Sequence, residues 1–90
     1  MMTEMFTVFD SAADAFLEPF FAPTVEVAIR MFRTLVNRED HQFHVYPEDY
    51  TLFHIGTFDG SRGLVDSLAT PHSIGLAQTF LDRGPSAGGE

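Results

Sequence analysis

Four histidines are the residues of this chain best suited to metal binding. His41 and His44 lie three positions apart in a polar segment beside Asp40, whereas His54 and His72 are distant in the sequence. A zinc site needs three or four ligands and further groups that orient them. The polar segment supplies only two histidines, and the chain contains no cysteine. We therefore expect exposed or hydrogen-bonded histidines, with no metal site and no cofactor.

Two adjacent carboxylates, Glu48 and Asp49, are the best candidates for acid-base chemistry. Such chemistry needs two groups that share a proton or flank a bond, and adjacent residues in a turn point apart. We expect Asp49 to accept backbone amides and Glu48 to be solvated. No serine, histidine and acid lie at a recognisable spacing, and no glycine-rich loop is present to bind phosphate. The sequence therefore predicts no enzyme and no small-molecule substrate.

Three arginines are the candidate nucleic-acid contacts. Arg30, Arg33 and Arg38 fall within one broad sector of a predicted helix, away from its apolar stripe. In a dimer, such a patch beside aromatic residues would suit single-stranded nucleic acid. The alternative is an ordinary solvated helix face on which Glu26 pairs with Arg30. The formal charge of −8, from thirteen acidic residues against five arginines and no lysine, favours this alternative and opposes nonspecific duplex binding.

Aromatic side chains form a second candidate for nucleic-acid binding. Seven of the ten phenylalanines lie in predicted strands or next to them, where they are typical of a core or a dimer interface. The alternative is a platform on which bases stack. The two interpretations compete for one surface, because a face covered by a partner subunit cannot also stack on DNA. The seven are Phe6, Phe9, Phe16, Phe20, Phe21, Phe53 and Phe58.

The longest motif runs from Tyr46 to Asp59, where Tyr-Pro-Glu-Asp-Tyr leads into Leu-Phe-His-Ile-Gly-Thr-Phe-Asp. It resembles the signature of the small nonstructural proteins of microviruses, the gokushovirus-like single-stranded DNA bacteriophages. Ile55 stands where that family usually has leucine, and Gly60 stands where it has a second aspartate. The same resemblance extends to Phe9-Asp10, to residues 12–16, to the block Pro19–Thr24 and to the helix start at Val25.

The motif has a structural explanation that requires no ligand. Pro47 sets its own φ angle and holds Tyr46 extended, so that the chain turns into the following strand. We therefore interpret the whole set as structural, namely Tyr46, Pro47, Glu48, Asp49, Gly56, Thr57, Phe58 and Asp59.

The elements that would position these residues begin with a strand over residues 3–9, where side chains alternate with a period of two. Pro19 and Pro23 limit Phe20–Ala22 to a short edge strand or an extended lead-in. Thr24 is a suitable N-cap for an amphipathic helix that begins at Val25 and ends near Asn37 or Arg38.

The second half of the chain starts with a polar loop over residues 37–42 and continues with a strand over residues 51–58. The loop Asp59–Gly63 predicts a hairpin. After Pro71 the pattern is ambiguous, since Ile74, Ala77 and Leu81 fit a short helix that Gly75 weakens. We expect one domain over residues 1–83 and a disordered tail over residues 84–90.

These elements predict an α+β fold, with a small antiparallel sheet and one amphipathic helix packed on one face. Both faces of the sheet are apolar, so the second face needs cover. A homodimer that stacks two sheets or exchanges edge strands would provide it, with Phe6, Val8, Phe53 and Ile55 as candidate interface residues. The alternative is a monomer whose C-terminal segment folds back over this face.

Size and composition restrict the setting. Ninety residues form one small core, and without cysteine no disulfide can reinforce it, which favours self-association. The N-terminus does not look like a secretion signal, and no segment approaches the roughly 20 apolar residues that span a bilayer. We expect a protein of the host cytoplasm that is not a virion component and does not bind membrane.

The resemblance implies a nonstructural accessory protein that acts late in genome replication, at the switch to single-stranded DNA synthesis and packaging. It would be a homodimer that engages the replication protein, the procapsid or single-stranded DNA. The alternative is an acidic protein-interaction adaptor, with a viral or host partner and no nucleic-acid contact.

Overall fold

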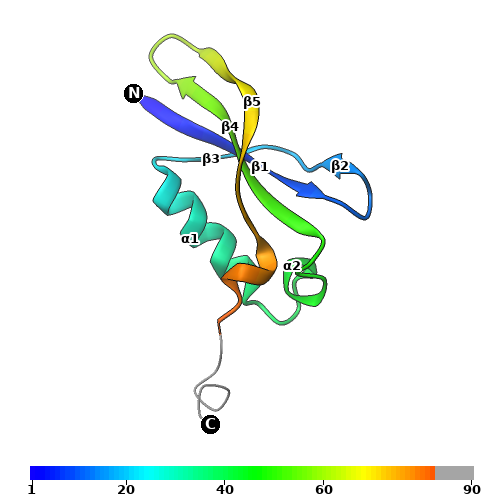
Figure 1. Cartoon of the computed structure of the whole chain (residues 1–90). Coiled ribbons are helices and arrows are strands. Elements are labelled where there is room, and N and C mark those ends of the chain that lie inside the picture. Colours follow the sequence, from blue (N-terminus) through cyan, green and yellow to red (C-terminus); the bar gives the residue numbers. More distant parts are fainter. Residues whose placement is uncertain (83–90) are drawn as a thin grey trace.

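The computed structural model describes residues 1–82, so the predicted disordered tail lies outside the described part of the chain. The predicted α+β class is confirmed, because an antiparallel sheet and one long helix make up most of the chain (Figure 1). Within these residues, no helix has both the length and the apolar character that a membrane span requires.

Strand β1 (Met2–Asp10) lies inside the sheet. One of its edges pairs with β4 (Tyr50–Asp59), and the other pairs with two short strands, β2 (Ala15–Phe16) and β3 (Phe20–Ala22). The alternation that predicted a strand over residues 3–9 is therefore confirmed. The prolines flanking β3 keep it to three residues, as expected for a short edge strand.

Strands β4 and β5 (Leu64–Leu76) form the predicted hairpin, and the sheet order is β2-β1-β4-β5. The carboxylate of Asp59 accepts hydrogen bonds from the backbone amides of Ser61 and Arg62, at 2.9 and 3.3 Å. Gly63 then takes a φ of 71°, a conformation that glycine adopts without a steric penalty. These contacts explain why the chain turns between residues 59 and 63.

The ambiguous segment after Pro71 is mainly strand. Ser73 pairs with Phe53 and Leu76 with Thr51, so β5 continues to Leu76. A single 3₁₀ turn, η1 (Ala77–Phe80), follows it. Backbone pairing with β4 decides the structure of this segment, although the apolar spacing is weakly helical. The local sequence does not reveal that pairing.

Helix α1 (Val25–Val36) begins as predicted, since the Thr24 hydroxyl accepts a hydrogen bond from the Val27 amide at 3.2 Å. A second, four-residue helix, α2 (Gln42–Val45), follows the polar loop and was not predicted. Its N-cap is His41, whose Nδ1 accepts a hydrogen bond from the Phe43 amide at 3.0 Å.

The hydrophobic core combines one face of the sheet with the helices. Phe6 and Leu52 from the sheet are fully buried together with Phe32 and Val36 from α1, and Phe43 of α2 and Ala77 of η1 complete the cluster. Phe32 packs against Phe43, with ring centroids 5.4 Å apart. One face of the sheet is thereby covered within the chain.

The structure corrects half of the predicted interface. Phe6 and Val8 are 0% and 4% exposed and belong to the core, so they are not available to a second copy. The register explains the error, because Val8 pairs with Leu52 whereas Phe53 pairs with Thr7. Cross-strand partners share a face and successive residues alternate, so Phe53 lies on the opposite face from Val8.

Candidate functional site: the open face of the sheet

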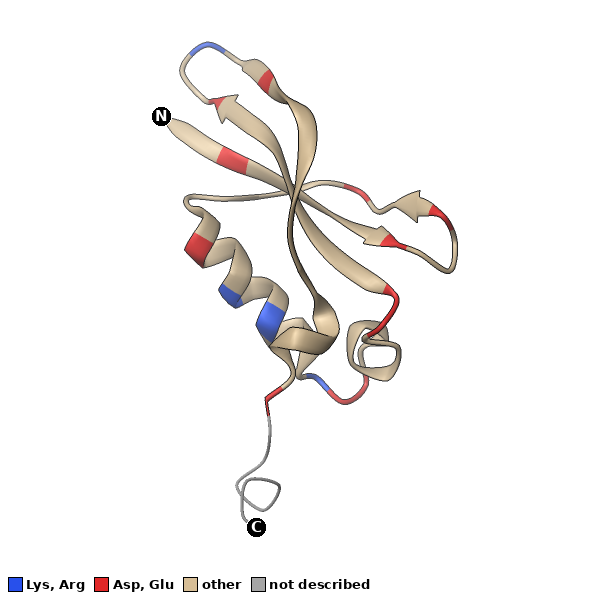
Figure 2. Ribbon diagram, viewed as in Figure 1, with Lys and Arg blue, Asp and Glu red and all other residues tan. Residues whose placement is uncertain are grey.

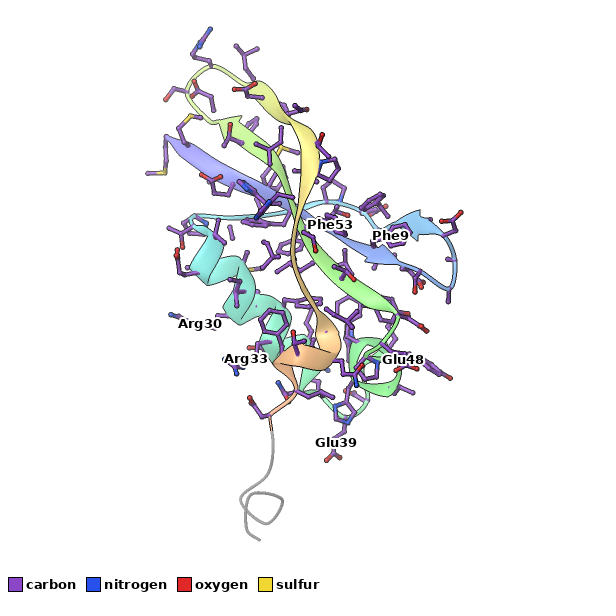
Figure 3. All side chains as sticks on the ribbon, in the orientation of Figure 1. Phe9, Arg30, Arg33, Glu39, Glu48 and Phe53 are labelled. Atoms are coloured by element: carbon purple, nitrogen blue, oxygen red, sulfur yellow. The ribbon has the colours of Figure 1, made fainter. Side chains whose placement is uncertain are left out.

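The face of the sheet opposite the core carries a row of aromatic rings. Phe9 of β1 pairs with Phe16 of β2, and their ring centroids are 4.8 Å apart. Phe16 in turn packs edge-on against Phe53 of β4 at 5.3 Å. Phe16 is 49% exposed although it is apolar. Phe9 and Phe53 lie in this part of the sheet in Figure 3.

A second aromatic contact continues the same face toward the hairpin. Phe21 of β3 pairs with Met5, and its ring lies 5.8 Å from that of Phe58. Phe58 pairs with Val65 of β5. Phe21 and Val65 are 47% and 56% exposed. We call this surface the open face and define it by Phe9, Phe16, Phe21, Phe53, Ile55 and Phe58.

A shallow hollow of about 200 Å³ lies beside Ile55 on the open face, lined by Thr7, Phe16, Leu17, Pro19, Ile55 and Pro71. The pairing of β1 with β4 shifts here, because Met5 pairs with Gly56 whereas Phe6 pairs with His54. Ile55 is the extra residue of this bulge, and bulges redirect side chains locally. The open face is therefore concave at this position as well as apolar.

The candidate arginines lie away from the open face and are partly neutralised. Arg30 and Arg33 lie on α1 (Figures 2 and 3), and Arg38 follows the end of this helix. The Arg33 guanidinium lies 3.2 Å from the Asp82 carboxylate, and that of Arg38 lies 3.6 Å from Asp40.

The expected Glu26–Arg30 ion pair is not formed among residues 1–82. Arg30 and Arg33 thus lie on α1 whereas Arg38 lies beyond its end, and carboxylates reduce the charge of Arg33 and Arg38.

The motif from Tyr46 to Asp59 makes hydrogen bonds that hold separate parts of the chain together. The main-chain carbonyl of Asp49 accepts a hydrogen bond from the Ser11 amide at 2.9 Å, and that of Pro47 accepts one from the Gln78 amide at 3.1 Å. Gly56 is buried and pairs with Ser67 of β5. These contacts agree with a structural role, and the acceptor at Asp49 is its backbone oxygen.

The histidines make separate contacts. Nε2 of His54 lies 2.8 Å from the Glu4 carboxylate, and Nδ1 of His44 lies 3.0 Å from the Val36 carbonyl oxygen. His41 caps α2, and its partial burial, together with the nearby Arg38 charge, lowers its pKa below the ordinary 6.5. Burial beside Asp10 and Asp49 raises the pKa of Tyr50 above its usual value. Within the described residues, no three potential metal ligands come together.

The comparisons with known proteins connect this fold to bacteriophages. A family model described as phage ORF5 protein matches residues 3–80. The chain belongs to this family. The match covers all the strands and helices that the structure describes except Met2, the first residue of β1, so the resemblance to a phage protein family is confirmed at this level. No curated protein and no solved structure matches the chain.

For this member of the phage ORF5 family, the sequence revealed the open face only in part. All the aromatic residues of the open face were candidates from the sequence. The sequence did not indicate which aromatic residues lie in the core and which lie on the surface. The alternation within β1 separates Phe6 and Val8 from Phe9, so the sequence was sufficient to place them on opposite faces of this strand. The relation of β1 to β4 depends on their register, which the sequence did not provide.

Proposed function

We propose that this phage protein is a nonstructural accessory protein of a microvirus, and that it acts as a homodimer in genome replication or in the switch to single-stranded DNA synthesis and packaging. It works by holding partner proteins rather than by catalysis. The observation that carries the proposal is the open face, with its two aromatic clusters on the uncovered side of the sheet.

The physical reason for a dimer is the free energy of burying apolar surface, about 25 cal/mol for each Å² removed from water. Phe16 and Phe21 are each about half exposed, and an aromatic side chain buries roughly 150 to 250 Å² in a core or interface. A two-fold axis would place the open faces of two copies against each other, so that each copy covers the same residues of the other.

Charge favours protein contacts over direct DNA contacts. Base stacking on aromatic residues is normally combined with a basic groove that follows the phosphates. On this chain the open-face residues are apolar, and the arginines at positions 33 and 38 already face carboxylates. The alternative function, an acidic adaptor without nucleic-acid contact, is favoured by the same ion pairs and by the net charge of −8.

The test combines light scattering with fluorescence anisotropy of a labelled single-stranded oligonucleotide at two salt concentrations. A dimer without oligonucleotide binding supports a role through protein partners, and a pull-down with the viral replication protein then separates the two functions. Salt-sensitive binding that is lost when Arg30 and Arg33 are changed to glutamate would instead show direct DNA contact. A monomer at all concentrations would contradict the dimer.

A further inference from the structure

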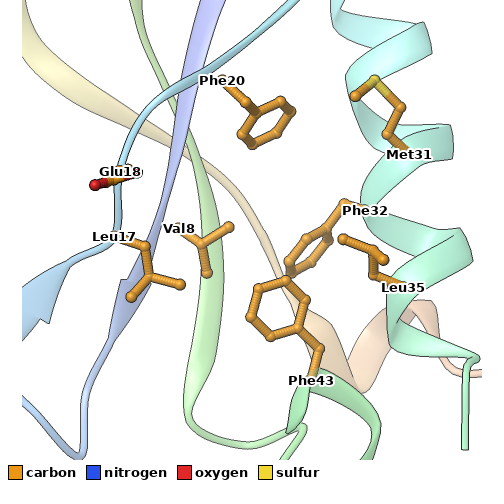
Figure 4. Close-up of a pocket in the computed structure, with 8 residues that line it drawn as sticks. All are labelled: Val8, Leu17, Glu18, Phe20, Met31, Phe32, Leu35 and Phe43. Carbon is orange, nitrogen blue, oxygen red and sulfur yellow. The ribbon is translucent and has the colours of Figure 1, made fainter. Parts of the chain in front are cut away.

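A second apolar concavity lies on the helix side of the sheet, away from the open face. It has a volume of about 260 Å³ and runs between the segment Leu17–Phe20 and helix α1 (Figure 4). We call it the connector groove. Its lining residues come from four separate parts of the chain, namely Val8, Leu17, Glu18, Phe20, Met31, Phe32, Leu35 and Phe43.

The walls of the connector groove are held in place by contacts among the lining residues and with Thr7 and Phe80 outside the groove. The Leu17 amide donates a hydrogen bond to the Val8 carbonyl at 2.8 Å, and the Leu17 carbonyl accepts one from the Thr7 hydroxyl at 2.6 Å. On the other side, Phe32 is fixed between Phe43 and Phe80 by aromatic contacts. The groove is therefore formed before any ligand arrives, which lowers the entropy cost of binding.

The shape and chemistry of the groove suit one large apolar side chain. Seven of its eight lining residues are apolar. An apolar cavity of ~150 Å³ is enough to hold a benzene-sized group, so the connector groove can take an aromatic ring. Met31 forms one edge and is 42% exposed. Methionine is flexible and polarizable, and it adapts to rings of different shape.

The charge around the groove selects among apolar ligands. Glu18 is the one charged residue of the lining, and it is exposed at the edge (Figure 4). At about 100° per residue, Met31 and Leu35 lie on one flank of α1, whereas Arg33 lies on another and faces Asp82. An exposed carboxylate beside the groove and a net charge of −8 disfavour fatty acids and nucleic acids and attract cations.

We propose that the connector groove binds a large apolar side chain of a partner protein, within a basic segment whose arginine or lysine pairs with Glu18. The apolar residue supplies most of the affinity, and the cation supplies specificity. The inference goes beyond the proposed function, because the groove lies on the opposite side from the open face. Each copy in a dimer would keep its own groove accessible.

The absence of tryptophan from the chain allows a direct test. The probe is the blocked peptide Arg-Ser-Trp-Ser-Arg, whose indole fluorescence shifts to shorter wavelength when the ring is buried. We expect saturable binding with such a shift. An acidic counterpart, Glu-Ser-Trp-Ser-Glu, should bind at least about tenfold more weakly. The peptide Arg-Ser-Ala-Ser-Arg should compete about tenfold to hundredfold less well than the probe, because it lacks the apolar anchor.

Variants locate the site. Met31→Gln should weaken the basic probe about tenfold, whereas Met2→Gln, at a methionine of similar exposure outside the groove, should leave binding unchanged. Glu18→Gln should reduce the preference for the basic over the acidic peptide. Light scattering of the same samples reports the oligomeric state separately, so a failure of the dimer is distinguishable from a failure of the groove.

Three outcomes would overturn the proposal. The first is no fluorescence shift at millimolar probe. The second is binding that Phe16→Glu on the open face abolishes while Met31→Gln has no effect, which would place the peptide elsewhere. The third is displacement of the probe by a single-stranded oligonucleotide or by anionic vesicles, which would indicate a different class of ligand.

Discussion

The backbone of Asp66 passes directly beside Gly56, so that a Cβ atom at position 56 would lie 2.5 Å from the Asp66 carbonyl oxygen. Real Cβ atoms essentially never approach that closely. The contact lies beside a shift in the register of β4 and β5, since Gly56 pairs with Ser67 whereas His54 pairs with His72. Gly56 is thus required by the close approach of two backbones, and the family motif that contains it has a structural cause here.

The substitution Gly56→Ala should therefore destabilise the fold by about 1 to 3 kcal/mol, and Gly56→Val by more, because backbone atoms have to move. Urea unfolding followed by circular dichroism measures the change. Gly63→Asn is the matched control, since asparagine tolerates the left-handed conformation and no atom lies within 4 Å of a Cβ there. Normal unfolding of Gly56→Val would contradict this structural role.

The ion pair or hydrogen bond between His54 and Glu4 should stabilise the pairing of β1 with β4. Both side chains are mostly buried, at 18% and 25% exposure, and their atoms lie 2.8 Å apart. A double-mutant cycle with Glu4→Ala and His54→Ala should give a coupling free energy of about 1 kcal/mol. A cycle that pairs Glu39→Ala with His54→Ala is the control and should give a value near zero.

The cap of α2 should make stability depend on pH. The folded-state pKa of His41 lies below its ordinary 6.5, so between these two values the unfolded chain binds more protons. The contribution is therefore complete above pH 6.5 and declines as the pH falls toward the lowered pKa. Protonation of Nδ1 also removes the acceptor of the Phe43 amide.

The measurement for His41 is the thermal midpoint at pH 7.5 and at pH 5.5, in the wild-type protein and in His41→Asn. Asparagine can cap a helix but does not titrate in this range. The variant should therefore lose less stability on acidification than the wild type. An equal loss in both proteins would show that other groups cause the pH dependence.

The open face should control self-association. Phe16→Glu would place a charge in the proposed interface, and we expect the dimer to dissociate at least about tenfold more readily. Val45→Glu is the control, because Val45 is 52% exposed and lies on α2, on the helix side of the sheet. Sedimentation equilibrium measures the two constants. Equal dissociation of both variants would exclude this face as the interface.

Local features of the sequence were sufficient for most of the elements. The period of two in residues 3–9, the prolines around Phe20–Ala22, the cap at Thr24 and the turn residues at Asp59–Gly63 all act over a few positions, and each predicted element is present. The α+β class followed from them. The helix α2 was missed because four residues carry too little periodic signal, and its cap is a histidine.

What the sequence alone determined is therefore local structure, the acidic surface and the surplus of apolar side chains. Only the tertiary structure decided which apolar residues remain exposed. The register of β1 with β4, and the bulge at Ile55, place Phe6 and Val8 in the core and Phe53 on the open face. A shift of one residue in register exchanges the faces of a strand, and pairing between strands some fifty residues apart depends on the whole fold.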